Sequence, residues 1–148
     1  MKRDLKGMKL RRGLVILAIG CVFLFVVVFS RPKSVVSTLN IKIAEIEVCS
    51  VLLLRQSGVS ADLEGPELEA LLDVLENTHV QFDGIDMHMK MPANTVRYLL
   101  HFQTHAGKTD KIIVGANGYV YTAVARYRII DDNEQALLAQ CNNIAPPK

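Results

Sequence analysis

The chain has 148 residues, of which 50% are hydrophobic and 22% charged, and its formal net charge at pH 7 is +2. Once an N-terminal segment of about 38 residues is set aside, this length allows one small domain and excludes two domains with separate cores. The net charge is too small for a nucleic-acid-binding surface, so nucleic acid is not expected as a partner.

The N-terminal segment combines a basic tail with an uncharged apolar stretch. Residues 1–12 carry six basic side chains against Asp4, and residues 13–30 carry no charge and contain thirteen Leu, Ile, Val or Phe residues. As a helix this stretch would be roughly 25–27 Å long, the lower limit for crossing a bilayer core. We therefore predict a basic cytoplasmic tail over 1–12 and a transmembrane helix over 13–30.

This arrangement predicts a single-pass membrane protein whose N-terminus is cytoplasmic and whose C-terminal domain is extracytoplasmic. A cleaved signal peptide is an alternative, although the hydrophobic region of signal peptides usually has only about 7–15 residues. Residues 31–39 are expected to form a linker, and residues 40–148 to form the extracytoplasmic domain.

The first half of this domain predicts a strand followed by a helix. Residues 40–55 are mainly apolar and read as a strand with a bulge, because the alternation of polar and apolar residues slips by one position. Gly65-Pro66 opens a helix that ends near Asn77, since proline suits the first helical turn. The apolar stripe of this helix consists of Leu68, Leu71, Leu72 and Leu75.

The second half predicts mainly strands. Residues 80–91, 95–104, 111–115 and 119–130 have strand patterns, with Asn117-Gly118 as a hairpin signal, and a helix follows from Asp131. The predicted fold is therefore α+β: a transmembrane helix, then an antiparallel sheet in the order β-α-β-β-β-β-α with two helices packed on one face.

The segment YLLHFQTHAGKTDKIIVGANGYVYTAVARYRII, which ends at Ile130, combines a strand, a glycine turn, a strand, an Asn-Gly turn and a Tyr-x-Tyr strand. With the preceding Leu-rich helix, this pattern resembles small single-pass membrane-protein and lipoprotein ectodomains of unknown function from Gram-positive bacteria. The resemblance covers about residues 61–138. It implies a fold and a location at a membrane, and it brings no activity and no site residues.

Acidic residues dominate the first helical region. Between Asp62 and Asp86 there are eight acidic residues and no Lys or Arg. This charge predicts either a docking face for a basic partner or a weak cation site. The alternative is that these residues form the solvated side of an amphipathic helix.

Methionine and histidine alternate in one predicted strand. Thioether and imidazole groups outside the cytoplasm can bind Cu(I), but alternation places the histidine on the opposite strand face from the methionines. The same pattern is typical of a half-buried strand without a metal. The candidate metal ligands are Met87, His88, Met89 and Met91.

Basic side chains on the later strands predict a second binding surface. The two histidines there are about 13 Å apart along an extended strand, which is too far for one metal ion. With the arginines they would form a basic sheet face for an anionic ligand, such as a wall polymer, a phosphate or a lipid headgroup; the alternative is a solvated outer face. The candidate residues are Arg97, His101, His105, Arg126 and Arg128.

Cys49 and Cys141 lie on the first predicted strand and the last predicted helix. Outside the cytoplasm they could form a disulfide, which would close a loop of about 90 residues and contribute up to about 4–5 kcal/mol in the chain-entropy model. Two buried free thiols are the alternative.

No motif predicts an enzyme or a cofactor. The chain lacks the patterns G-x-S-x-G, H-E-x-x-H and C-x-x-C, and it has no phosphate-binding or dinucleotide-binding loop. We therefore predict a membrane-anchored extracytoplasmic interaction module without catalytic activity, which docks a protein or a cell-envelope component. The alternative is an envelope sensor or carrier that binds a small ligand or a metal through the Met/His strand or the basic face.

Overall fold

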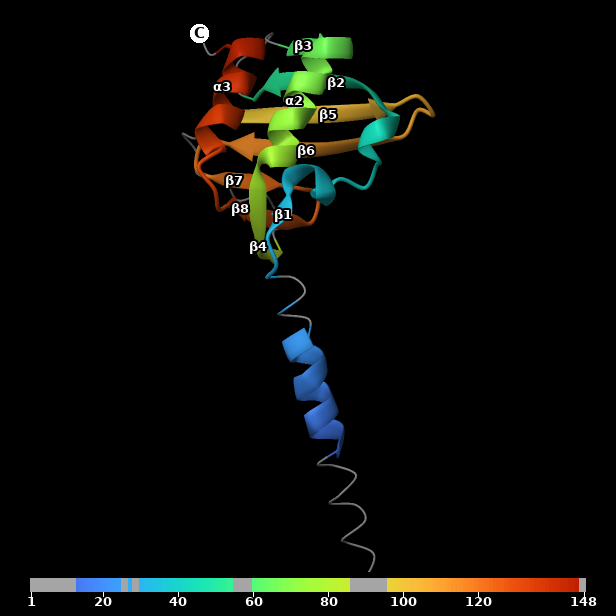
Figure 1. The fold of residues 1–148 in the computed structure, drawn as a ribbon, viewed down its shortest axis with the longest axis vertical. Coiled ribbons are helices and arrows are strands. Elements are labelled where there is room, and N and C mark those ends of the chain that lie inside the picture. Colours follow the sequence, from blue (N-terminus) through green and yellow to red (C-terminus); the bar gives the residue numbers. More distant parts are fainter. Residues whose placement is uncertain (1–12, 25–26, 28–29, 55–59, 86–95, 147–148) are drawn as a thin grey trace, which may run out of the picture. The chain divides into compact units, whose positions relative to one another are not determined.

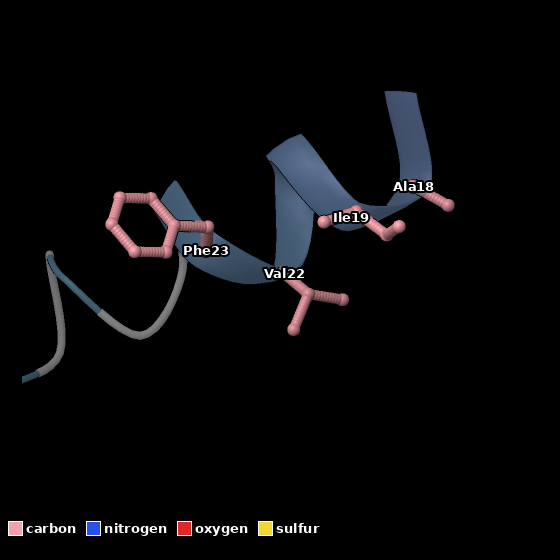
Figure 2. Close-up of a pocket in the computed structure, with 4 residues that line it drawn as sticks. All are labelled: Ala18, Ile19, Val22 and Phe23. Atoms are coloured by element: carbon pink, nitrogen blue, oxygen red, sulfur yellow. The ribbon is translucent and has the colours of Figure 1, made fainter. Parts of the chain in front are cut away.

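The computed structural model describes residues 13–24, 27, 30–54, 60–85 and 96–146. The chain divides into two compact units, residues 1–31 and residues 32–148. In the first unit, residues 13–24 form a helix with exposed apolar side chains. Figure 2 shows Ala18, Ile19, Val22 and Phe23 projecting from this helix. These four residues line a hollow of about 390 Å³.

The predicted transmembrane helix over 13–30 is wrong. In the described part of the chain, no helix is both long enough and apolar enough to cross a membrane. The single-pass anchor, and with it the cytoplasmic N-terminus and extracytoplasmic domain, is therefore not supported.

The second unit is built on an eight-stranded antiparallel sheet (Figure 1). Across the sheet the strand order is β1-β4-β8-β7-β6-β5-β2-β3, so β1 and β3 are the edge strands. In chain order the strands are β1 (Lys33–Ser34), β2 (Ile46–Leu53), β3 (Ser60–Leu63), β4 (His79–Ile85), β5 (Arg97–Thr104), β6 (Thr109–Gly115), β7 (Tyr119–Tyr121) and β8 (Ala125–Ile129).

One face of the sheet forms the core of the unit. Along β5, Tyr98, Leu100 and Phe102 alternate with half-exposed or exposed residues and are fully buried. The strand register extends this face sideways, because Leu100 is paired with Val51 of β2 and Ile112 of β6. Burial of these β-branched and aromatic side chains is the main contribution of the sheet to stability.

Two helices complete the core, α2 (Gly65–Asn77) and α3 (Glu134–Ile144). Figure 1 shows both helices on the same side of the sheet, with α2 crossing in front of the central strands. Two short 3-10 helices, η1 (Val35–Thr38) and η2 (Ile43–Glu45), precede β2. The helical residues buried against the sheet include Leu68, Leu71 and Leu75 of α2 and Leu137 and Cys141 of α3.

The α+β class and the antiparallel sheet agree with the sequence, but the predicted strand order is incomplete. The segment 119–130 was expected to be one strand and is instead β7 and β8, joined by a turn in which the N–H of Thr122 donates to the carbonyl of Ala125 at 2.9 Å. This turn contains no Gly, Pro, Asn or Asp, so the usual sequence signals are missing. The turn places Tyr121 opposite Arg126 on one sheet face, whereas a single strand would put them on opposite faces.

Residues 33–38, which lie within the predicted linker, form β1 and η1. Val35 is fully buried and Val36 is 5% exposed. The N–H of Val35 also donates to the carbonyl of Thr78 at 2.9 Å, which ties η1 to the end of α2. This segment is therefore an integral part of the domain core.

The Asn117-Gly118 hairpin is present, but its loop is longer than the two-residue type I′ turn that the dipeptide suggests. Gly115 is paired with Tyr119, so three residues form the loop, and Gly118 has a φ of 77°. A three-residue loop with glycine in the left-handed conformation is a common alternative hairpin. The glycine is therefore needed at the last loop position.

Candidate functional site

A groove lies where β3, the first turn of α2 and the end of α3 meet. Figure 1 shows these three segments together at one end of the sheet. The groove has a volume of about 480 Å³ and a mainly apolar lining with a few polar side chains. Its lining residues are Ala61 and Leu63 of β3, Pro66, Glu67 and Ala70 of α2, and Gln140, Asn143 and Ile144 of α3.

The sequence around Gly65 places α2 beside β3. The strand ends at Leu63 and the helix begins at Gly65, so Glu64 alone connects them. Gly65 has a φ of 54°, which residues with a side chain rarely adopt, and Pro66 lies in the first helical turn, where no N–H donor is needed. The chain therefore turns sharply, and the first turn of α2 lies next to the strand it follows.

Small side chains leave room in the groove. Ala70 is exposed on α2, and Ala61 is half-buried on β3. On the other side, α3 is fixed to the core by Cys141 and Ala145, which are both fully buried. The groove is thus a space between firmly packed elements and is bordered by alanine methyl groups.

The strand that borders the groove is an edge strand of the described sheet. Among the described strands, β3 pairs with β2 alone and stands at the end of the sheet. In an antiparallel strand, alternate residues direct their N–H and C=O groups away from the existing partner. The outer edge of β3 therefore offers backbone donors and acceptors to a further strand.

Carboxylates surround this edge. Asp62, Glu64, Glu67 and Glu69 are all exposed, and β3, α2 and α3 contain no Lys or Arg. The ion pairs formed by the described residues involve none of these four carboxylates. The groove is therefore an apolar hollow in a negatively charged surface.

Arg97 and Arg128, two of the predicted basic residues, share a sheet face but lie on strands that are not neighbours. The pairing runs from Arg97 through Gly115 and Tyr119 to Arg128, on the face opposite the buried core residues. Two strands separate the two arginines, which places their Cα atoms about 14 Å apart at about 4.8 Å per strand. Both side chains would have to extend fully towards each other to bind one small anion.

Arg126 is engaged by a neighbouring carboxylate. Its Nε donates to Asp83 Oδ2 at 2.7 Å, and its guanidinium lies 5.2 Å from the ring centre of Tyr119. The hydrogen bond to Asp83 raises the pKa of Arg126 above its ordinary value. This arginine is thus held in an ion pair on the sheet surface.

The two histidines lie apart from these arginines. His101 is paired with Lys111 and with Ser50 in the middle of the sheet, while His105 lies in the turn after β5. The Nδ1 atom of His105 is 3.2 Å from Glu47 Oε2. The five predicted basic residues are therefore spread over the sheet face and beyond its end.

The predicted metal ligands Met87, His88, Met89 and Met91 lie outside the described residues. Within the described part of the chain, no group of three or more His, Cys, Asp or Glu side chains is placed to hold a metal ion.

Cys49 and Cys141 are both fully buried and carry free thiols in the structure. Burial raises the pKa of both thiols to about 12, and for Cys49 the neighbouring Cys141 and Asp62 add smaller effects in the same direction. Cys49 is paired with Leu63, so the two thiols lie in the core behind the groove. With a pKa raised this far, both thiols are protonated at neutral pH.

The groove was not among the sites predicted from the sequence. The acidic stretch 62–86 and the Gly65-Pro66 helix start marked one of its walls, but the other wall is the end of α3, more than seventy residues later. Local sequence patterns do not reveal contacts between residues so far apart in the chain.

No protein-family model, curated protein or solved structure matches the chain.

Proposed function

We propose that the second unit is a non-catalytic interaction module that binds an extended segment of a partner protein in the groove beside β3. One observation supports this proposal most directly: a strand edge without a described neighbour borders an apolar groove of about 480 Å³. Edge strands of this kind accept an added strand, in which backbone hydrogen bonds give affinity and neighbouring pockets select side chains.

The alternation of side chains along β3 explains how the strand edge and the groove would bind one segment together. Ala61 and Leu63 lie on the face that includes the groove, and Asp62 lies on the opposite face. A segment added along the outer edge would therefore direct alternate side chains toward the groove. Small-ligand binding at the basic sheet face has weaker support, because the basic residues there are dispersed.

The test uses a phage-displayed library of random peptides selected on the full chain. Ala70→Trp fills the groove from an exposed helical position and should weaken binding of the selected peptides at least tenfold. The control is Ala136→Trp, which places the same side chain at an exposed position on α3 outside the groove lining. Fluorescence anisotropy with labelled peptides measures both affinities.

Hydrogen exchange locates the bound peptide. Backbone amides of β3 should exchange more slowly when a selected peptide is bound, because added strand hydrogen bonds protect them. The proposal fails if no peptide is enriched, or if the enriched peptides bind Ala70→Trp as well as wild type and leave exchange in β3 unchanged.

A further inference from the structure

We infer that the segment bound beside β3 is basic, with Lys or Arg alternating with apolar residues; this inference rests on the proposed function and specifies its partner. The four exposed carboxylates around the groove, Asp62, Glu64, Glu67 and Glu69, form no ion pair among the described residues. A cationic segment would supply the missing positive charges.

The positions of the carboxylates match the two sides of an added strand. Asp62 is on the sheet face opposite the groove, where it would meet every second side chain of the segment. Glu67 lines the groove itself, where the apolar side chains would lie, and it adds to the negative charge around the segment. Cross-strand pairs of opposite charge stabilise neighbouring strands, and like charges directly opposite each other destabilise them.

The same charges select against other partners. An acidic segment would place carboxylates beside this cluster, and the repulsion would reject it. Charged edges also prevent uncontrolled pairing of one sheet with another, and a second copy of this chain would bring the same negative edge. A basic segment is therefore the occupant that the charges admit.

Three short, capped peptides test this inference with the full chain. One alternates Lys and Val, one alternates Glu and Val, and one alternates Thr and Val. We expect the Lys peptide to bind at least tenfold more tightly than the Thr peptide at low ionic strength, and the Glu peptide to bind most weakly. Added salt should weaken binding of the Lys peptide most strongly, because exposed charges are screened.

A matched pair of variants assigns the effect to the edge of β3. Asp62→Asn, on the face that the Lys side chains would meet, should weaken the Lys peptide about threefold, a larger loss than for the Thr peptide. Glu76→Gln removes one charge from an exposed position near the C-terminal end of α2 and should leave binding of both peptides unchanged.

The outcomes separate the two proposals. If the Lys and Thr peptides bind equally and both are lost in Ala70→Trp, the charge inference is overturned while the peptide-binding groove stands. Equal binding of the Lys peptide to wild type and Asp62→Asn also overturns it. If none of the peptides binds and the random library yields no groove-dependent peptide, the proposed function itself is wrong.

Discussion

At the residue scale, the carboxylate of Asp131 connects the start of β4 to the approach to α3. Its Oδ2 accepts the backbone N–H of His79 at 2.6 Å and lies 3.1 Å from Nδ1 of the same residue, and its Oδ1 accepts the N–H of Asn133 at 3.2 Å. Burial raises the pKa of Asp131, but these hydrogen bonds outweigh burial and lower the pKa below its ordinary value.

We expect Asp131→Asn to lower the free energy of unfolding by about 1–2 kcal/mol at neutral pH, because an amide is a weaker acceptor than a carboxylate. A lowered pKa means that the carboxylate stabilises the fold above its ordinary pKa and that this effect is lost as pH falls through the lowered value. The difference in unfolding free energy between wild type and Asp131→Asn should therefore shrink in acid. Urea unfolding at several pH values measures it, with Asp132→Asn as the control; a difference that does not vary with pH would contradict the assignment.

The thiols allow a second prediction at this scale. Cys21 is exposed, while Cys49 and Cys141 are buried and their pKa is raised to about 12. In the folded chain without reductant, a thiol reagent at mildly alkaline pH should titrate Cys21 rapidly and the other two only after denaturation, since little thiolate is present. If denaturation releases no further thiol until reductant is added, Cys49 and Cys141 are bonded and the free-thiol state is wrong.

At the scale of single elements, α2 is attached by one apolar stripe. Leu71 is fully buried, whereas the adjacent Leu72 is half-buried. We expect Leu71→Ala to destabilise the domain by about 2–5 kcal/mol through lost burial and a residual cavity, and Leu72→Ala to cost clearly less. Urea unfolding followed by circular dichroism measures both, and equal losses would show that the helix packs in another orientation.

The helices were easier to predict from sequence than the strands. The stripe of α2 is visible because leucines recur with helical spacing between a Gly-Pro start and an asparagine end. β3 was missed because its alternation of polar and apolar residues covers only four positions and includes serine and aspartate, and aspartate is depleted in strands. The break between β7 and β8 was missed because Thr122 provides it through its own hydrogen bonds to Ala125.

At the scale of the whole molecule, the boundary of the folded domain can be tested by truncation. A chain that starts at Pro32 should keep the unfolding free energy of the second unit, because it contains the whole unit. A chain that starts at Asn40 lacks β1 and the buried residues Val35 and Val36, and it should be less stable by about 3–6 kcal/mol. Urea unfolding of both fragments checks this, and equal stabilities would show that residues 33–38 are dispensable.

The sheet order and the groove could not be predicted from the sequence. Alternation indicated which residues face the core, but it did not indicate that β4 pairs with β8, since Val80 and Ile129 are joined by tertiary contacts alone. The groove has the same origin, because Ala70 and Ile144 line it from two helices that are far apart in the sequence. The sequence showed that one wall of the groove is acidic, but it did not show that this wall lies beside a strand edge.

The strand order also has a consequence for the kinetics of folding. The meander from β5 to β8 closes through short connections, whereas β4 finds its partner only when β8 is available, 49 positions along the chain from Val80 to Ile129. During synthesis, β4 therefore leaves the ribosome well before the strand that completes its hydrogen bonding. Such non-local pairing slows folding to milliseconds or longer and leaves a transient unpaired edge that chaperones would have to protect.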